Sequence, residues 1–356
     1  MNEQPFMRRC FDLARLGVGS VSPNPMVGAV SVHEGRIIGE GWHQKYGKAH
    51  AEVNCVASVS PENQRLLPYS TLYCSLEPCF HFGKTPPCVD LILEKKIPRV
   101  VVANTDSNPH VAGKSLEKLR AAGVEVVSGI LEEEGHWLNR TFFTWITKRR
   151  PYIILKWAQT ADGFIGRPGE RTAISGPAAL RLVHRWRSEA DAILVGSATA
   201  VVDNPRLDTR FYFGKKPLRV VFDRHGKIPA GFHLLDDSAE TWVFGPERSR
   251  IHPSDDFESS DESFKQTKFF PTEGKVLIPN LLEQLAQTNC ATLLVEGGAN
   301  VLNQFLENGL WDEIRVIENG RRLGGGLPAP NVPEGAILKE QFRIGEDVVR
   351  VSIRVE

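Results

Sequence analysis

The sequence predicts an α/β protein with two consecutive domains, and three observations lead to this prediction. Strand-like and helical patterns alternate in both halves of the chain, which is typical of layered α/β folds. The length of 356 residues suits two domains of roughly 100–200 residues each. A charged run closed by a proline, Lys148-Arg149-Arg150-Pro151, separates a predicted helix from a new strand. We therefore expect one domain over residues 1–147 and another over residues 148–356.

The first domain shows its elements in a regular order. Apolar residues at helical spacing predict a helix over residues 6–16. Two strands, 26–32 and 36–41, flank the turn His33-Glu34-Gly35. The chain then continues with a helix over 50–58, a strand over 71–76, a helix over 88–96 that Pro86 and Pro87 introduce, a strand over 99–103, a helix over 114–122, a strand over 124–127 and a single closing helix over 131–145.

The second domain repeats the alternation. Its predicted elements are a strand over 152–157, a helix over 178–186, strands over 192–195 and 218–222, a helix over 281–286, a strand over 292–295 and a helix over 301–308. The polar and acidic stretch 249–268 is predicted to be a surface loop without a function of its own.

Composition and charge exclude several classes of protein. Charged residues make up 24% and hydrophobic residues 41%, which excludes a mainly disordered chain. Residues 1–150 hold 18 basic and 15 acidic side chains, and the remainder holds 25 and 28, so neither part suggests an extended nucleic-acid surface. No run reaches the roughly 18 apolar residues of a membrane helix, and the N-terminus lacks the pattern of a signal peptide. We expect a cytoplasmic protein that binds neither nucleic acid nor membranes.

The cysteines give the first indication of chemistry. Five of the six lie in the first quarter of the chain, namely Cys10, Cys55, Cys74, Cys79 and Cys88. In a reducing compartment they need a role other than disulfide formation. A metal site is one such role, and the residues around two of these cysteines favour it.

His50-Ala51-Glu52 begins a predicted helix, and Cys79 and Cys88 each follow a proline downstream. One imidazole and two thiolates make three protein ligands, and catalytic zinc sites use three ligands and leave a fourth position for water. Glu52 lies two residues after His50, close enough to move protons without binding the metal. We expect His50, Cys79 and Cys88 to bind one Zn²⁺ and Glu52 to be the catalytic acid and base of a deaminase.

Two other interpretations of these residues stay open at this point. A structural zinc site would recruit a fourth ligand, for which Cys74 and His81 are candidates, and the protein would then be a non-enzymatic scaffold. A deaminase of nucleic-acid bases usually shows the spacing P-C-x-x-C, whereas eight residues separate Cys79 from Cys88 here. That longer loop and the balanced charge disfavour a nucleic-acid substrate.

The motifs in combination resemble those of the bifunctional deaminase/reductase family of riboflavin biosynthesis. The resemblance covers nearly the whole chain and is highly specific. It is carried by SPNPMVGAV at residues 22–30, PCFHFGKTPPC at 78–88, TDSNPHVAGKSLEKLRAAGVEV at 105–126, RRPYIILKWAQTADG at 149–163, DAILVGSATAVVDNPRLDTR at 191–210 and LLVEGGANVLNQFL at 293–306.

For the first domain, the resemblance implies a cytidine-deaminase-like α/β/α fold with one zinc ion. The implied substrate is 2,5-diamino-6-(5-phosphoribosylamino)pyrimidin-4(3H)-one, whose 2-amino group is replaced by water. Residues that match substrate positions of the family are Asn24, His43, Lys84, Thr85, Asp106 and Asn108. Amides and carboxylates can recognise exocyclic amines, and a lysine can meet a phosphate, so these residue types suit such a substrate.

The second domain lacks the G-x-G-x-x-G fingerprint of many dinucleotide sites. Instead, Val295-Glu296-Gly297-Gly298 follows an apolar strand and precedes a helix, where glycines let a phosphate approach free backbone N–H groups. From the residues alone, a plain turn between strand and helix is the simpler interpretation.

The resemblance implies a dihydrofolate-reductase-like α/β fold for this domain. It also implies NADPH as cofactor and reduction of the ribosyl group to a ribityl chain, with hydride transfer to C1′. Matching substrate positions are Arg171, Arg187, Leu207, Arg210 and Glu296. Matching cofactor positions are Ala158, Ala173, Thr199, Asp203, Gly298, Ala299, Asn300, Val301, Leu302, Asn303 and Gln304. Members of the family form dimers or larger assemblies, so a homo-oligomer is expected.

The chain departs from the family pattern at a few of these positions. Ala173 stands where the family often has a tryptophan, and Arg171 where it has a serine. The segment 318–330 lacks the family's A-P-x-L-L-G pattern, and its glycines Gly324-Gly325-Gly326 are expected to form only a loop. Lys156 is a further candidate beside substrate or cofactor.

Overall fold

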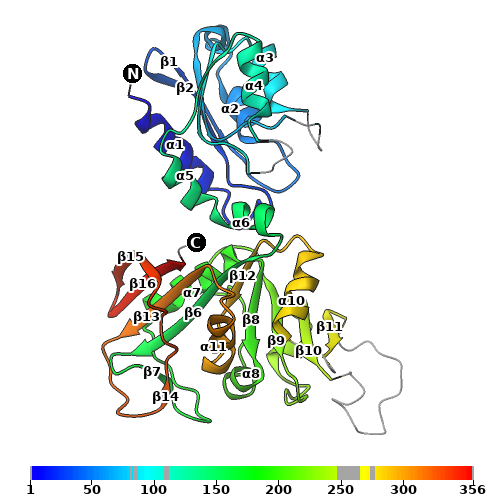
Figure 1. The fold of residues 1–356 in the computed structure, drawn as a ribbon, viewed down its shortest axis with the longest axis vertical. Helices are drawn as coiled ribbons and strands as arrows, with labels where there is room; N and C mark the ends of the chain where they lie inside the picture. The colour runs from blue at the N-terminus through cyan, green and yellow to red at the C-terminus, as the bar shows by residue number, and fades with distance from the viewer. Residues whose placement is uncertain are drawn as a thin grey trace. The chain divides into compact units, whose positions relative to one another are not determined.

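Helices and strands alternate through the computed structural model, and the described strands form two large sheets and one two-stranded sheet (Figure 1). The structure describes residues 2–80, 82, 86–107, 112–246, 265–272 and 277–354. The chain divides into one unit over Met1–Arg149 and a second over Arg150–Glu356. Among the described residues, no helix combines the length and apolar character needed to cross a bilayer.

The described part of the first unit contains five strands with several helices around them. Its elements are α1 (Gln4–Arg15), β1 (Gly28–His33), β2 (Arg36–Trp42), α2 (Ala51–Ser58), the 3-10 helix η1 (Gln64–Tyr69), β3 (Thr71–Leu76), α3 (Cys88–Glu94), β4 (Arg99–Asn104), α4 (Lys114–Ala121), β5 (Glu125–Val127), α5 (Glu132–Leu138) and α6 (Arg140–Lys148).

The five strands form one sheet in the order β2-β1-β3-β4-β5. β1 runs antiparallel to both neighbours, whereas β3, β4 and β5 are parallel. Helices α2, α3 and α4 cover one face, and α1 and α5 cover the other (Figure 1). The unit is therefore an α/β/α sandwich, and the carboxyl ends of β3 and β4 lie side by side at one sheet edge.

The expected elements of this unit form with small changes at their ends. The β1–β2 turn, for example, has left-handed backbone at Glu34 and Gly35, with φ of 48° and 77°. The single closing helix expected over 131–145 is wrong: the structure has α5 and α6, with a break at Asn139. The Asn139 side chain accepts from the backbone N–H of Met26 at 2.8 Å and donates to its carbonyl at 2.9 Å. These long-range bonds anchor the break to the segment before β1.

The second unit is built around a larger sheet. Its elements are β6 (Tyr152–Thr160), β7 (Phe164–Gly166), α7 (Pro177–Glu189), β8 (Ala192–Gly196), α8 (Ser197–Asp203), β9 (Leu218–Phe222), the 3-10 helix η2 (His233–Leu235), β10 (Thr241–Gly245), β11 (Thr267–Pro271), α10 (Leu277–Ala286), β12 (Thr292–Val295), α11 (Ala299–Glu307), β13 (Glu313–Asn319), β14 (Leu327–Pro328), β15 (Ala336–Ile344) and β16 (Asp347–Arg354).

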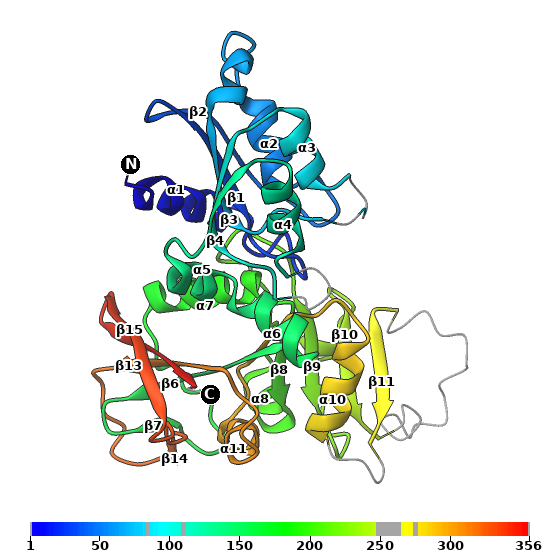
Figure 2. The ribbon, with the colours of Figure 1, turned by 45° about the horizontal axis from the view of Figure 1, so that its top comes forward.

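Nine of these strands form one sheet in the order β11-β10-β9-β8-β12-β6-β13-β16-β15. The run from β11 to β13 is parallel, and the β16–β15 hairpin joins β13 in antiparallel fashion (Figure 2). β7 pairs separately with β14. α10 and α11 share an apolar core with Ile314 of β13. α7 lies on the opposite face, where its Trp186 ring stacks with the guanidinium of Arg315.

Several elements of this unit carry no prediction from sequence, among them α8, β10, β13, β15 and β16. The loop expected over 249–268 is wrong at its end, because Thr267 and Lys268 belong to β11 and pair with β10. Residues 249–264 of that stretch lie outside the described residues.

Candidate active sites

His50, Cys79 and Cys88 come together from three different elements of the first unit. His50 is the N-cap of α2, Cys79 lies three residues after β3 ends, and Cys88 is the first residue of α3. His50 Nδ1 lies 3.4 Å from each of the two sulfur atoms. The ligand atoms of all three residues lie within 4.8 Å of one another.

Close packing of α2 on β2 sets the place of His50. An ideal Cβ at Gly41 of β2 would lie 2.2 Å from the backbone nitrogen of Cys55 in α2. Only glycine permits α2 to pack this closely on β2, and this packing places His50, at the N-terminus of α2, beside Cys79 and Cys88.

The donor set fits zinc. A tetrahedral Zn²⁺ with normal bond lengths places a ligand nitrogen and a ligand sulfur about 3.6 Å apart, close to the spacing observed. Cys74 does not belong to the cluster in the described structure and lies in the apolar core between the sheet and helices α2, α3 and α4. His81, the other possible fourth ligand, lies outside the described residues. Three protein ligands are the number found in catalytic zinc sites.

Contacts within the cluster shift the pKa values of all three of its members. Hydrogen bonding with the Cys88 thiol, followed by contacts with His50 and the backbone N–H of Cys88, lowers the pKa of Cys79 to about 4. The hydrogen bond with Cys79, followed by burial, raises the pKa of Cys88. The hydrogen bond to Cys79 also raises the pKa of His50. A divalent cation among these atoms would favour thiolates at both cysteines and a neutral imidazole.

Glu52 lies in the first turn of α2, with a side chain that is almost fully buried. Burial raises the pKa of Glu52 to about 7, and the Cys79 charge adds to this effect. A carboxyl group with a pKa near neutrality can both accept and donate a proton at the pH of a cell. The structure thus places a potential acid and base directly beside the metal cluster.

Asn24 and His43 extend this site. The Asn24 side-chain amide donates to Nε2 of His43 at 3.3 Å, and His43 Nδ1 lies 3.1 Å from the carbonyl of Ala49. Burial lowers the pKa of His43, which favours the neutral ring that this pattern requires. The centroids of the His43 and His50 rings lie 5.4 Å apart, and the two rings are arranged edge to face. Asp106 follows β4, beside the exit of β3 that leads to Cys79. The other predicted contacts, Lys84, Thr85 and Asn108, lie outside the described residues.

In the second unit, Arg187 and Glu296 form a buried bidentate ion pair. Arg187 Nε and one terminal nitrogen each lie 2.8 Å from a carboxylate oxygen of Glu296. Lys156 Nζ lies 3.8 Å from the same carboxylate. Burial alone would raise the pKa of Glu296, but the charges of Arg187 and Lys156 lower it to about 2. Burial outweighs the attraction of Glu296 and lowers the pKa of Lys156.

The turn after β12 packs tightly against the turn after β8. The Thr199 hydroxyl accepts from the backbone N–H of Gly298 at 2.8 Å. An ideal Cβ at Gly297 would lie 2.7 Å from the backbone nitrogen of Gly196, so the turn requires glycine there. Because β8 and β12 are parallel neighbours, α8 and α11 both begin at the same sheet edge. The cofactor positions predicted over residues 298–304 form this turn and the first part of α11.

The remaining predicted residues of this unit lie on several different segments. Burial raises the pKa of Asp203, and the nearby charge of Arg171 opposes that rise, so these two predicted positions are within electrostatic reach. Leu207 is buried with a left-handed φ of 48°. Arg210 forms an ion pair with Asp208, whose carbonyl also accepts from Arg187 at 3.4 Å. Ala158 lies on β6 opposite Ile317, and Ala173 is exposed.

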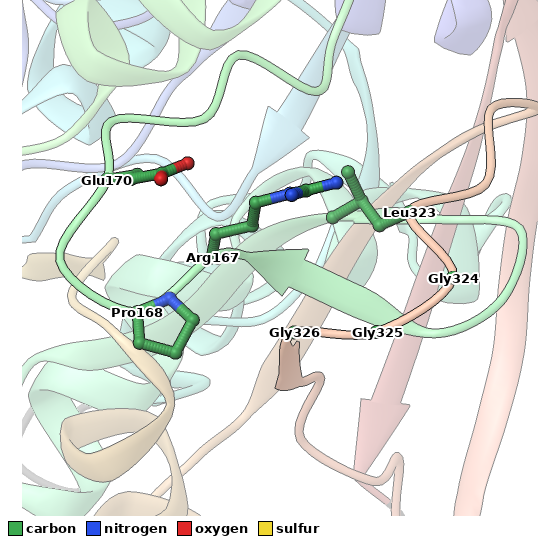
Figure 3. A pocket seen from close by; sticks show the side chains of 7 residues that line it. All are labelled: Arg167, Pro168, Glu170, Leu323, Gly324, Gly325 and Gly326. Carbon is green, nitrogen blue, oxygen red and sulfur yellow. The ribbon is translucent and has the colours of Figure 1, made fainter.

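A concave site of about 440 Å³ lies beside the segment that carries Arg171 and Ala173 (Figure 3). Its lining residues are Arg167, Pro168, Glu170, Leu323, Gly324, Gly325 and Gly326. The Arg167 side chain extends toward Leu323, across from the glycines (Figure 3). The three glycines expected to form only a loop thus also line a hollow, and none of the predicted site residues lines it.

Sequence reasoning missed two buried polar residues near these sites. Glu77, between β3 and the zinc-ligand segment, accepts four hydrogen bonds from residues 106–115. Its signal was an acidic residue directly before Pro78-Cys79 at the end of an apolar strand. His184 of α7 is fully buried, and neither of its ring nitrogens has a hydrogen-bond partner among the described residues. Burial, reinforced by Arg187 and Arg210, lowers the pKa of His184 to about 4.

Comparisons with known proteins match both units. Residues 1–104 match the family model of the cytidine and deoxycytidylate deaminase zinc-binding region. Residues 151–349 match the model of the RibD C-terminal domain. These matches and the two large sheets confirm the predicted fold class and the prediction of zinc as a cofactor of the first unit.

Full-length relatives show the same order of domains. The chain is 38% identical to the riboflavin biosynthesis protein RibD of Aquifex aeolicus, over 98% of this chain and 97% of the relative. It is 31% identical to the Escherichia coli RibD, over 91% and 89%. Among solved structures, a diaminohydroxyphosphoribosylaminopyrimidine deaminase/5-amino-6-(5-phosphoribosylamino)uracil reductase from Thermotoga maritima is 34% identical with a TM-score of 0.87, covering 99% and 98%. RibD of Acinetobacter baumannii is 30% identical with a TM-score of 0.85, covering 99% of each chain.

Proposed function

Because the chain belongs to the RibD family of bifunctional deaminase/reductases in riboflavin biosynthesis, we propose how its residues share the two reactions. Residues 1–147 catalyse hydrolytic deamination of 2,5-diamino-6-(5-phosphoribosylamino)pyrimidin-4(3H)-one to 5-amino-6-(5-phosphoribosylamino)uracil. Residues 148–356 reduce the ribosyl group of that product to a ribityl chain with NADPH. The observation that carries the proposal is the cluster of His50, Cys79 and Cys88 with Glu52 buried beside it.

In the deaminase, His50, Cys79 and Cys88 hold the metal, and Glu52 moves the protons. Bound zinc lowers the pKa of water to about 7 and so makes hydroxide available as a nucleophile at neutral pH. Glu52 would take one proton from the attacking water as the new C–O bond forms at C2 of the ring. It then delivers a proton to the departing 2-amino group, which leaves as ammonia when the C–N bond breaks.

The residues around the cluster orient the pyrimidine. The Asn24 amide is held by His43, which in turn is held by the backbone of Ala49. An amide fixed in this way presents its carbonyl oxygen as an acceptor for an exocyclic amine. Asp106 and Asn108 offer further polar contacts to the ring, and Lys84 and Thr85 bind the ribose phosphate.

In the reductase, the ion pair of Arg187 and Glu296 with Lys156 is the proposed chemical centre. NADPH, when bound, would supply the hydride for the new C–H bond at C1′, and the ring oxygen O4′ would take a proton as its bond to C1′ breaks. The Lys156–Glu296 pair holds a transferable proton, because the pKa of Lys156 is lowered by burial. Arg171, Leu207 and Arg210 complete the substrate contacts, and an arginine can bind the phosphate with two hydrogen bonds.

The tight turn around Gly298 is the proposed cofactor site. Glycines at the start of α11, next to the start of α8, leave backbone N–H groups that can bind a pyrophosphate. The residues proposed to contact NADPH are Ala158, Ala173, Thr199, Asp203, Gly298, Ala299, Asn300, Val301, Leu302, Asn303 and Gln304.

Two separate assays on the purified full chain test this division. Ammonia release is measured from the diaminopyrimidinone ribotide, and NADPH absorbance is measured after the deaminated product is supplied directly. The proposal expects turnover in both. Deamination without NADPH oxidation would contradict the reductase assignment, and substitutions at Ala173 and Arg171 would then be the first variants to make.

We also propose a cytoplasmic homo-oligomer, a dimer or larger. All six cysteines are free thiols, as expected in a reducing compartment. The edge strand β15 exposes Ile337, Leu338 and Phe342, with 53%, 52% and 37% of each residue accessible. Such an apolar edge strand is a natural site for pairing with a second copy. Light scattering during size-exclusion chromatography measures the mass of the protein in solution. The mass of a single chain would contradict the proposed oligomer.

A further inference from the structure

Glu77 joins two segments of the deaminase unit that are far apart in sequence. It directly follows β3 and precedes Pro78-Cys79, and only 5% of the residue is exposed. Its Oε2 atom accepts from the backbone N–H groups of Asp106 and Gly113, each at 3.0 Å. Its Oε1 atom accepts from the backbone N–H of Ser115 at 3.2 Å and from the Ser115 hydroxyl at 2.5 Å.

These four bonds converge on both ends of one segment. Asp106 lies shortly after β4, and Gly113 and Ser115 begin α4, so a single carboxylate fixes the entry and the exit of residues 106–113. Placing the carboxylate at the first turn of α4 is also electrostatically favourable. Meanwhile the backbone N–H of Glu77 donates to the carbonyl of Asn104 at 2.9 Å, which ties it to the end of β4 as well.

The same residue is two positions away from a zinc ligand. Cys79 leaves β3 through Glu77 and Pro78, and Asp106 leaves the neighbouring parallel strand β4. The side chain of Glu77 therefore sets the distance between the metal-binding segment and the segment that carries Asp106. Its acceptor positions are occupied by residues 106–115, and Glu77 is not part of the metal cluster.

We propose that Glu77 is a positioning residue of the deaminase that holds the segment of Asp106 in its substrate-binding place. The proposal rests on the proposed function, because it takes Asp106 as a substrate contact. Without the carboxylate, the segment must be ordered each time a substrate binds, and ordering backbone costs free energy. Loss of Glu77 should therefore weaken substrate binding and leave the chemistry at zinc largely intact.

Three variants of the full chain test the assignment: Glu77→Ala, Glu77→Gln and, as the matched control, Ser115→Ala. Glu77→Ala removes all four bonds. Glu77→Gln can keep its carbonyl oxygen on the N–H groups of Asp106 and Gly113. Its amide NH₂ then faces the backbone N–H of Ser115, which is also a donor, so the bond to that N–H is lost. Ser115→Ala removes only the hydroxyl bond and leaves both ends of the segment attached.

For Glu77→Ala, we expect the KM of deamination to rise at least about tenfold, equivalent to about 1.4 kcal/mol at 25 °C. We expect kcat to stay within about threefold, because the metal and Glu52 are untouched. Zinc content should remain one ion per chain, and the reductase activity of the same molecule should be unchanged. Ser115→Ala should keep KM within about threefold of the parent chain, and the KM of Glu77→Gln should lie between those of the parent chain and Glu77→Ala.

Other outcomes overturn the assignment. A Glu77→Ala variant with unchanged KM shows that the segment needs no such anchor. Loss of zinc from that variant makes Glu77 a support of the metal site instead. A Ser115→Ala variant as impaired as Glu77→Ala shows that the hydroxyl bond matters and not the attachment of both ends of the segment. If Glu77→Ala does not fold, hydrogen exchange of the backbone amides of Asp106 and Gly113 is measured in the parent chain and in Glu77→Gln. Rapid exchange of either amide would overturn the proposal. A parent chain that releases no ammonia instead contradicts the proposed function.

Discussion

At the scale of the residue, the proposed deaminase site consists of one buried carboxyl group beside the cluster of His50, Cys79 and Cys88. Glu52 is positioned by the first turn of α2, directly after the N-cap His50. Burial raises the pKa of Glu52 to about 7, so the group can carry a proton in either direction near neutral pH. Its task is separate from metal binding, and a substitution can separate the two.

We predict that Glu52→Ala retains zinc and loses deamination by roughly 10²–10⁴-fold, the usual contribution of a general acid or base. The measurement is ammonia release together with metal analysis of the purified variant. Its reductase activity is the internal control and should match that of the parent chain. Deamination close to the parent rate would remove Glu52 from the mechanism.

The buried pair of Arg187 and Glu296 has a defined pH dependence. Because the pKa of folded Glu296 is about 2, below the ordinary value of 4.5, the ionised pair stabilises the fold above pH 4.5. That contribution decreases as the pH falls from 4.5 toward 2. We predict that the stability advantage of the parent chain over Glu296→Gln, measured by urea unfolding, is larger at pH 6 than at pH 3. An advantage that grows on acidification would contradict the ion pair.

At the scale of the element, close packing between α2 and β2 places the zinc ligand His50. Gly41 has no room for a side chain, since a Cβ would lie 2.2 Å from the backbone nitrogen of Cys55. Helix α2 would have to move away from the sheet to accommodate a methyl group, and His50 would move with it.

We therefore predict that Gly41→Ala destabilises the first unit by about 1–3 kcal/mol, the usual cost of overpacking, and weakens zinc binding. Urea unfolding and zinc titration with a competing chelator measure the two effects. Gly231→Ala is the matched control, because a Cβ there meets no atom within 4 Å. Equal zinc affinity in both variants would show that α2 does not set the site.

Elements with strong local patterns were predictable from sequence, and those that depend on distant contacts were not. Strand β3 over Thr71–Leu76 and strand β12 over Thr292–Val295 form where the apolar runs predict them. The break at Asn139 escaped prediction because its cause is a pair of hydrogen bonds to Met26, far away in sequence. The grouping of His50, Cys79 and Cys88 was predictable because each residue belongs to a recognisable sequence motif. The role of Glu77 was not, because its hydrogen-bond partners lie about 30 residues or more further along the chain.

At the scale of the whole molecule, the chain carries two chemically independent centres. The metal cluster belongs entirely to the unit over Met1–Arg149, and the pair of Arg187 and Glu296 belongs entirely to the unit over Arg150–Glu356. Cys79 and Asp106 follow the carboxyl ends of the parallel strands β3 and β4, and Thr199 and Gly298 follow those of β8 and β12, the edge where α/β proteins bind their ligands. Family membership joins the centres in sequence, since the product of the first is the substrate of the second.

The measurement that tests the account most directly is the effect of zinc removal on the two activities of one preparation. The full chain is treated with a chelator, and ammonia release and NADPH oxidation are followed separately, the latter with the deaminated product supplied. We predict that deamination is lost and returns on adding Zn²⁺, while NADPH oxidation continues at the parent rate throughout. Deamination that survives complete removal of zinc would contradict the account of the site at His50, Cys79 and Cys88.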